Sequence, residues 1–301
     1  MHQSPLILRA QVLQAIRQYF TEQGFLEVET PLLIPANAPE EYIDPLATLP
    51  CWQLQTSPEI CMKRLLCRGY QRIFQISHCW RAGERGSRHL TEFTMLEWYR
   101  ADADYDILMA DCAGLLRRVA ASCIADGTFS RFGKKIDPHA EWAHISVQEA
   151  FLRFAQADAL ASAENGRFDE LLVSQIEPAL ENFTVPVILA DYPAQLAALS
   201  RLKSDDPRLA ERFELYLAGL ELANGFSELN DPQEQRTRFE EANQRRAAAG
   251  RQVLPLPERF LDELSAMPLS AGIALGVDRL VMLAVGAETI DDVVAFRPEE
   301  L

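Results

Sequence analysis

The sequence contains no run of 18 or more apolar residues, so no segment is long enough to span a bilayer as a helix. Its N-terminus lacks a charged start followed by a long apolar stretch, and no signal peptide is expected. The six cysteines lie in the first half of the chain and form no C-x-x-C pair, which argues against a zinc site. We therefore expect reduced, mostly buried thiols in a cytoplasmic protein that makes no membrane contact.

Basic charge is also scarce, since the formal net charge is −15. Proteins that bind a long nucleic acid through its phosphates usually carry a basic face, so this balance argues against a broad RNA-binding surface but not against a local basic patch. The 301 residues, 48% of them hydrophobic, suffice for one large core or two modest ones. Because we find no repeat, low-complexity tract or domain linker, we predict one domain over residues 1–301.

The hydrophobic periodicity indicates an α+β fold. Apolar residues at helical spacing, with suitable start signals, predict helices over residues 6–24, 105–124 and 232–249, and a capping box at Ser146–Glu149 predicts another. Residues 72–80 and 92–99 read as two strands joined by a charged loop, and residues 213–222 and Phe226 read as paired strands. Residues 35–50 are rich in proline and read as a loop. Strands grouped in hairpins favour an antiparallel sheet flanked by helices.

A run of small residues stands out near the C-terminus. Gly272, Ala274 and Gly276 occupy every second position, which leaves one face of a strand bare for a flat ligand. Arg279 follows where the strand turns into a helix, and its planar fork suits a phosphate. The alternative is a buried strand packed on a helix.

The loop between residues 80 and 92 carries several cationic groups in a short stretch, namely Arg81, Arg85, Arg88 and His89. Such a cluster suits a polyphosphate, and Phe93 beyond it could stack on a nucleobase. The alternative is a solvated charged loop.

Acidic residues recur at seven-residue intervals as Glu214, Glu221 and Glu228. On a helix they would share a face, whereas on a hairpin the register decides, and both arrangements remain open. Carboxylates among apolar residues need a cation, which Mg²⁺ with a triphosphate would supply. Glu59 and Glu97 add further acids that could receive an amino group; an exposed acidic face is the alternative.

Several motifs in order resemble those of class II aminoacyl-tRNA synthetases of the lysyl branch. Residues 24–31 are similar to motif 1, residues 81–93 to motif 2 and residues 272–279 to motif 3, and the similarity runs from about Arg9 to Phe296. It implies the class II synthetase catalytic fold, with an antiparallel sheet flanked by helices, and a homodimer formed through motif 1.

The sequence also departs from lysyl-tRNA synthetases. Only eight residues precede Arg9, which leaves no room for the anticodon-binding β-barrel, and Ala274 stands where glycine is usual. Both features resemble a stand-alone branch of the family, the elongation factor P–(R)-β-lysine ligases. In motif 2, Gly83 takes the place of the usual acid and Glu84 follows it, while Leu90 replaces a polar residue.

The resemblance implies a role for each matching residue. Arg81 and Arg279 would be catalytic and hold the phosphates of ATP. The other expected ATP contacts are Glu84, His89, Phe93, Glu214, Glu221, Leu222 and Gly276. Glu214 and Glu221 would bind Mg²⁺. The amino-acid pocket would be lined by Ser57, Glu59, Glu97, Tyr99, Asn224, Phe226, Glu228 and Ala274.

The activity implied by this resemblance is an ATP-dependent ligation in two steps. (R)-β-lysine, or lysine, would be activated as an aminoacyl-adenylate and passed to a lysine side chain of elongation factor P. Two alternatives remain, a truncated lysyl-tRNA synthetase acting on tRNA and a non-catalytic amino-acid-sensing paralogue. The acidic charge argues against tRNA, and the presence of the phosphate-binding arginines argues against a sensor.

Overall fold

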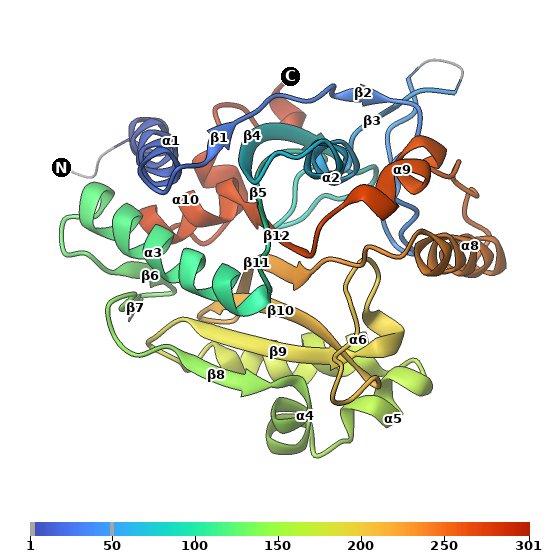
Figure 1. Ribbon diagram of the computed structural model, residues 1–301. Helices are drawn as coiled ribbons and strands as arrows, with labels where there is room; N and C mark the ends of the chain where they lie inside the picture. Colours follow the sequence, from blue (N-terminus) through green and yellow to red (C-terminus); the bar gives the residue numbers. More distant parts are fainter. Residues whose placement is uncertain (1–3, 49–50) are drawn as a thin grey trace.

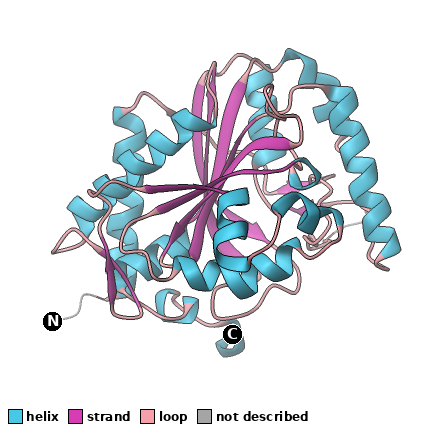
Figure 2. Ribbon diagram, turned by 90° about the horizontal axis from the view of Figure 1, so that it is seen from below, coloured by secondary structure: helices cyan, strands magenta, loops and turns pink. Residues whose placement is uncertain are grey.

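An eight-stranded mixed sheet runs through the middle of the computed structural model, which describes residues 4–48 and 51–301 (Figures 1 and 2). The strand order is β1-β4-β5-β12-β11-β10-β9-β8. The strands are β1 (Leu26–Glu27), β4 (Arg72–Trp80), β5 (Glu92–Ala101), β8 (Ala143–Ser146), β9 (Val187–Pro193), β10 (Leu209–Leu217), β11 (Leu220–Ser227) and β12 (Ser270–Gly276).

The predicted antiparallel sheet is confirmed for its six central strands. At the two edges, β1 pairs with β4 and β8 pairs with β9 in parallel, so the whole sheet is mixed. Parallel neighbours need a crossover connection rather than a tight turn. The short edge strands are reached in this way, because long segments separate them in sequence from the strands they pair with.

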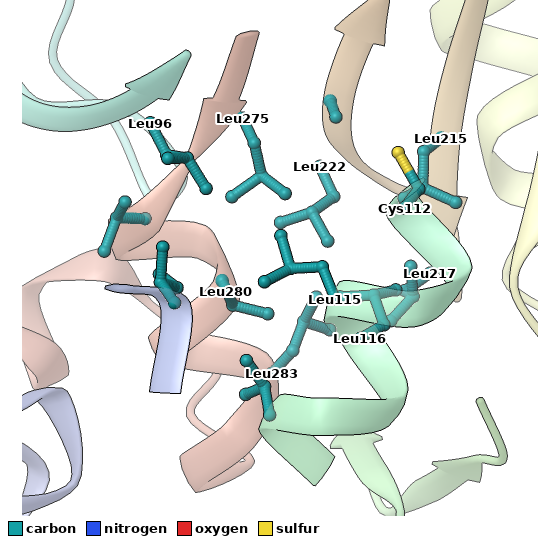
Figure 3. Close-up of a cluster of buried hydrophobic side chains, with 14 of the residues drawn as sticks. Leu96, Cys112, Leu115, Leu116, Leu215, Leu217, Leu222, Leu275, Leu280 and Leu283 are labelled. Atoms are coloured by element: carbon teal, nitrogen blue, oxygen red, sulfur yellow. The ribbon is translucent and has the colours of Figure 1, made fainter. Parts of the chain in front are cut away.

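Three helices cover one face of the sheet: α1 (Pro5–Glu22), α3 (Tyr105–Cys123) and α10 (Val277–Val285). Each buries an apolar stripe; in α1 it begins with Leu8, Val12 and Ile16. Figure 3 shows leucines of α3 and α10 packed against leucines of β5, β10, β11 and β12. This cluster is the main hydrophobic core, and it leaves the opposite face of the sheet for other elements.

The opposite face is covered in part by α2 (Glu59–Cys67) and α9 (Glu258–Glu263), which pack with Ile73 of β4 and Tyr99 of β5. The long helix α8 (Pro232–Ala248) packs beside α9 and lies far from α1 (Figure 1). Asp231 caps it, accepting hydrogen bonds from the backbone nitrogens of Gln233 (2.8 Å) and Glu234 (3.1 Å).

A smaller layer of short helices packs against β8 and β9 (Figure 1). It contains α4 (Val147–Ala150), α5 (Ala159–Glu164), α6 (Phe168–Leu171) and α7 (Glu177–Leu180), with π-helical turns at Phe151–Ala155 and Leu172–Ile176. Two small hairpins lie outside the main sheet, β2 (Leu33–Ile34) with β3 (Gln53–Leu54) and β6 (Phe129–Arg131) with β7 (Lys134–Ile136). Short 3-10 turns occupy Ala194–Leu196, Leu264–Ala266, Ile290–Val293 and Pro298–Glu300.

Most of the predicted elements are confirmed, with shifts at their ends. Ser146 caps α4 through a hydrogen bond from the backbone nitrogen of Glu149 (3.1 Å). The paired strands do form a hairpin, but its turn falls at Ala218–Gly219, inside the range that the sequence assigned to the first strand. The last two residues of the expected loop over residues 35–50, like residues 1–3, lie outside the described residues.

The cysteines are less buried than expected. Only Cys79 and Cys112 are fully buried, three others are half-buried, and Cys51 is exposed. All six are free thiols in the described chain. Within residues 4–48 and 51–301, no helix is both long and apolar enough to cross a membrane.

Candidate active site

The hairpin register brings the predicted acids onto one face of the sheet. Glu97 of β5 lies opposite Ala274 of β12, which lies opposite Asn224 of β11, which lies opposite Glu214 of β10. In the next row, Tyr99, Gly272, Phe226 and Arg212 follow one another across the same four strands. Because side chains alternate between faces, both rows point away from the main core, whereas the residues next to them along the strand, such as Leu96 and Trp98, are buried in it.

Two connected cavities open over these rows. The first, which we call the outer cavity, has a volume of about 230 Å³ and lies between the loop after β4 and the start of α10. The second, the inner cavity, has a volume of about 130 Å³ and lies between α2 and strands β5, β11 and β12. Both are bordered by Glu40, Arg81, Met95, Asn224 and Ala274. A ligand with two parts could therefore occupy both cavities across this shared boundary.

Arg81 lies at that boundary with most of its donors free. Its guanidinium lies 5.2 Å from the ring centroid of Phe93. Its Nε donates a long hydrogen bond to the carbonyl of Thr56 (3.4 Å), and Nη1 is 3.9 Å from Glu84 Oε1. These contacts orient the side chain without saturating it, so its remaining N–H groups can meet an anion. Phe93 and Glu84 border the outer cavity, as the expected nucleotide contacts should.

Arg279 sits in the first turn of α10, on the opposite wall of the outer cavity. Its Nη1 donates to the backbone carbonyl of Glu221 (2.7 Å), and its Nη2 lies 2.7 Å from His89 Nε2. Burial and the charge of Arg279 lower the pKa of His89 to about 4, so the imidazole is neutral and its Nε2 accepts the hydrogen bond. His89 therefore holds Arg279 in place.

The predicted metal-binding acids lie on neighbouring strands. Glu214 accepts hydrogen bonds from Arg212 Nη2 (2.6 Å) and Tyr216 Oη (2.6 Å), whereas Glu221 borders the outer cavity. Burial and the charge of Glu221 raise the pKa of Glu214. A divalent cation would relieve this repulsion between like charges, so the pair fits Mg²⁺ bound together with phosphates.

Leu222 differs from its expected role. The strand β11 has a bulge opposite Leu215 and Tyr216 of β10, and this bulge shifts the alternation of its side chains between the two faces of the sheet. The Leu222 side chain therefore lies in the core (Figure 3). Leu222 is only 2% exposed, so it can offer the outer cavity little more than its backbone.

The inner cavity is lined by carboxylates with few donors. Glu97 is 1% exposed and accepts hydrogen bonds from Ser57 Oγ (2.5 Å) and Tyr99 Oη (2.8 Å). Burial, followed by the charge of Glu59, raises the pKa of Glu97 to about 8. All of the substrate residues expected from the sequence border the inner cavity except Glu228, which lies buried behind it. A cationic ligand would lower the raised pKa of Glu97, so these crowded acids favour a cation.

Lys63 is the cation that this cluster already contains. Its side chain is completely buried, and Nζ lies 2.6 Å from Glu59 Oε1 and 2.5 Å from Glu228 Oε2. Nζ also lies 5.1 Å from the ring centroid of Phe226. Burial raises the pKa of Glu228 to about 8 even though Lys63 opposes this rise. Glu228 is completely buried and borders neither the outer nor the inner cavity, so its charge can act on a ligand only from behind the residues that line the inner cavity.

The bare strand face serves the site in two ways. Gly276 borders the outer cavity, and a Cβ at this position would lie 3.6 Å from the nearest atom, Arg279 Cδ. The backbone of Gly276 is therefore open to a ligand, as expected. At Gly272 the space is already filled, because a Cβ would overlap the Tyr99 ring and Glu228 Oε1. This glycine makes room for Tyr99, which lines the inner cavity, and for Glu228 behind it.

We expect Gly272→Ala to raise the KM for the amino acid at least tenfold, because the new methyl group displaces Tyr99 and Glu228. Overpacking should also lower the free energy of unfolding by about 1–3 kcal/mol. Amino-acid-dependent ATP–pyrophosphate exchange and thermal unfolding measure the two effects. Gly276→Ala is the matched control, since it should keep wild-type stability and alter the KM for ATP instead. An unchanged amino-acid KM in Gly272→Ala would contradict this assignment.

Several residues that border or support the site were not among the sequence candidates, among them Glu40, Lys63, Met95 and Arg212. Lys63 follows Glu59 by four residues in α2, and this ion-pair spacing could have indicated it. Glu40 lies in a loop, where no periodicity indicates the direction of a side chain.

Together the two cavities are bordered by guanidinium groups that can bind a phosphate chain, an aromatic ring that can stack on a base, and buried carboxylates that can bind one or more ammonium groups. No side chain at their boundary is a thiol or hydroxyl nucleophile. Such an arrangement suits the direct attack of a bound carboxylate on a nucleotide phosphate, promoted by positioning and by neutralisation of charge.

Comparisons with known proteins agree with this geometry. The family model described as tRNA synthetases class II (D, K and N) matches residues 1–300. The chain is 42% identical to the elongation factor P–(R)-β-lysine ligase of Erwinia tasmaniensis over 97% of its own length and 94% of that protein. It is 39% identical to the ligase of the same name from Proteus mirabilis, over 97% and 94% of the two chains. For that of Avibacterium paragallinarum the identity is 40%, over 98% and 95%. The chain belongs to the class II tRNA synthetase family, in the branch that contains these ligases.

Proposed function

We propose that this protein is an ATP-dependent ligase that activates (R)-β-lysine and transfers it to a lysine side chain of elongation factor P. The observation that carries the proposal is that an outer cavity bordered by Arg81, Phe93 and Arg279 meets an inner cavity bordered by Glu59 and Glu97, with Arg81 at the boundary. The names of the similar proteins support the substrate and the protein acceptor. Membership of the class II synthetase family implies the use of ATP.

In the first step, an oxygen of the amino-acid carboxylate attacks the α-phosphorus of ATP, and the bond to the β-phosphate breaks to release pyrophosphate. Arg81, which borders both cavities, would hold the α-phosphate beside the carboxylate, and Arg279, which borders the outer cavity, would hold the far end of the triphosphate. Glu221 and Glu214 would hold Mg²⁺, which neutralises phosphate charge when bound. The product is an aminoacyl-adenylate lying across both cavities.

The inner cavity supports a diamino acid as substrate. Glu59 and Glu97 border the inner cavity, and Glu228 lies buried beside Lys63. The pKa values of Glu97 and Glu228 are raised to about 8, and a ligand with two ammonium groups would lower them and let these carboxyl groups ionise. Ala274 lies at the floor between the two cavities, where its methyl group narrows the space beside the reacting carboxylate. We infer that this favours one lysine isomer over the other.

The expected homodimer and cytoplasmic location stay predictions. Large apolar side chains are exposed on the segment similar to motif 1, with Leu26 at 50%, and on the helix α1 before it, with Leu6 at 47% and Ile7 at 55%, which supports burial against a second copy. We expect one catalytic domain over residues 1–301 and no tRNA partner.

The proposal is tested by supplying ATP with (R)-β-lysine or lysine and either elongation factor P or tRNA. We expect (R)-β-lysine to be attached to elongation factor P, as detected by intact-protein mass spectrometry, and no attachment when the acceptor lysine is replaced by arginine. Preferential charging of tRNA would overturn the proposal in favour of a truncated synthetase. Absence of pyrophosphate exchange with either isomer would favour the sensing paralogue.

A further inference from the structure

A third cavity adjoins the two that hold the adenylate. This side cavity has a volume of about 590 Å³ and lies between the loop at residues 39–42, the segment before β10 and the helix α8. It shares Ala198, Leu199 and Arg212 with the inner cavity. Among the residues that the structure describes, Glu40 alone borders the outer, inner and side cavities.

The backbone around Glu40 is held firmly from α8. Arg246, which is completely buried, donates from Nη1 to the carbonyls of Glu40 (2.8 Å) and Ile43 (2.9 Å) and from Nη2 to Asp44 Oδ1 (2.5 Å). The carbonyl of Asp44 in turn accepts from the backbone nitrogen of Ala82, next to Arg81. The loop is therefore fixed to both α8 and the arginine that faces ATP.

The carboxylate of Glu40 has no such partner. The residue is half-buried, and its side chain makes no hydrogen bond or ion pair with residues 4–48 or 51–301. Burial raises its pKa to about 7; Arg81 and Arg212 lower it, while Glu59 and Glu84 raise it. These are the charged groups facing it from the β4–β5 hairpin, β10 and α2. A carboxylate with such a pKa and a free face is suited to proton exchange near neutral pH.

The side cavity offers the acceptor an approach to the adenylate. Its nucleotide fills the outer cavity and its aminoacyl part fills the inner cavity, so the reactive carbonyl lies at their boundary. The side cavity reaches that boundary at Glu40. Its lining contains five carboxylates and three guanidinium groups, a negative balance that attracts an ammonium group.

We propose that the acceptor lysine of the protein substrate enters through the side cavity and that the Glu40 carboxylate takes a proton from its ammonium group. This inference rests on the proposed function. It assigns a general base to the second step, which the arginines cannot supply because they stay protonated.

The step balances as follows. The lysine ammonium gives one proton to Glu40, and the neutral nitrogen then attacks the carbonyl carbon of the adenylate to form the new C–N bond. When the tetrahedral intermediate collapses, the bond from that carbon to the phosphate oxygen breaks and AMP leaves with the electron pair. The second proton lost from nitrogen goes to the departing phosphate, and Glu40 returns its proton to solvent through the side cavity.

The test is Glu40→Gln, measured in two separate reactions. In single turnover from preformed adenylate, we expect transfer to elongation factor P at pH 7 to slow by about 10²-fold, the usual size of a general-base effect. The fold decrease in the rate of pyrophosphate exchange should be at least ten times smaller than the fold decrease in the rate of transfer. Glu240→Gln, an exposed residue of α8 outside all three cavities, is the matched control and should retain wild-type rates in both reactions.

The pH profile provides a readout that a merely structural role would not change. Wild-type transfer should rise with pH as Glu40 ionises and level off above about pH 7. The Gln variant should lose this inflection, and Glu40→Asp should restore it in part. Thermal unfolding checks that each variant is folded.

Two results would overturn the inference. One is single-turnover transfer in Glu40→Gln at the wild-type rate with an unchanged pH profile. The other is an increase in the amino-acid KM in exchange with normal transfer, which would make Glu40 a substrate-binding group. Failure of the wild-type enzyme to modify elongation factor P would instead defeat the proposed function, so the two failures are distinguishable.

Discussion

Arg81→Ala should reduce kcat/KM for ATP–pyrophosphate exchange by about 10² to 10³-fold, equivalent to roughly 3–4 kcal/mol of transition-state stabilisation. Arg81 borders both cavities, so its guanidinium reaches the point where the carboxylate oxygen and the α-phosphate share negative charge. Since its contacts within the protein are few and long, folding should be little affected. Arg81→Lys should recover only part of the rate, because an ammonium group cannot offer two parallel donors.

Arg85→Ala is the matched control on the same loop. Arg85 pairs with Asp291 (2.9 Å) and Glu299 (2.9 Å) away from both cavities, so exchange should stay near the wild-type rate. A near-normal exchange rate in Arg81→Ala, with saturating ATP and amino acid, would remove this residue from the catalytic centre.

Lys63→Met should give the largest loss of stability, about 3–5 kcal/mol in the free energy of unfolding at pH 8. The substitution leaves Glu59 and Glu228 near each other without their shared cation. A carboxyl group whose pKa is raised in the folded state loses stability as pH rises toward that pKa, because the unfolded state ionises more easily. The pKa of Glu228 is about 8 with Lys63 present and should rise further without it. The deficit of the variant should therefore grow between pH 7 and pH 9, because Glu228 of the wild type ionises beside Lys63 in this range and Glu228 of the variant does not.

Chemical denaturation at these two pH values measures this effect. The double variant Lys63→Met/Glu228→Gln serves as the control, since removal of the uncompensated charge should recover most of the stability. It should still bind the amino acid poorly, because the charge that acts on the ligand from behind the inner cavity is gone. If Lys63→Met and the wild type had the same free energy of unfolding at pH 8, the buried ion pairs would not be needed for stability.

The ion pairs also explain why the site can be stable before substrate binds. Burying three carboxylates without compensation would be costly, and Lys63 neutralises part of their charge from beneath the cavity. Glu97 receives hydrogen bonds from Ser57 and Tyr99 instead. The remaining negative charge is available to a ligand, so stability and selectivity for a cation come from the same cluster.

The amino-acid sequence by itself determined the fold class, the main helices and strands, and many of the residues that meet at the site. The spacing of apolar residues, alternating in strands and every three or four positions in helices, reflects directly which side chains are buried. The order of the three motifs identified the family. The sequence predicted that Arg81, Phe93 and Arg279 contact one nucleotide, and all three border the outer cavity. They could be predicted because their local signals, a charged loop and a strand-to-helix turn, depend on few distant contacts.

Only the tertiary structure decided how strands distant in sequence are aligned. The seven-residue spacing of Glu214, Glu221 and Glu228 fitted a helix face or a hairpin, and the bulge in β11 places Glu221 over the cavity and Leu222 in the core. The roles of Gly272, Lys63 and Glu40 likewise depend on neighbours from other elements. Strand register and loop path are set by packing between distant segments, and that information is not contained in any local stretch of sequence.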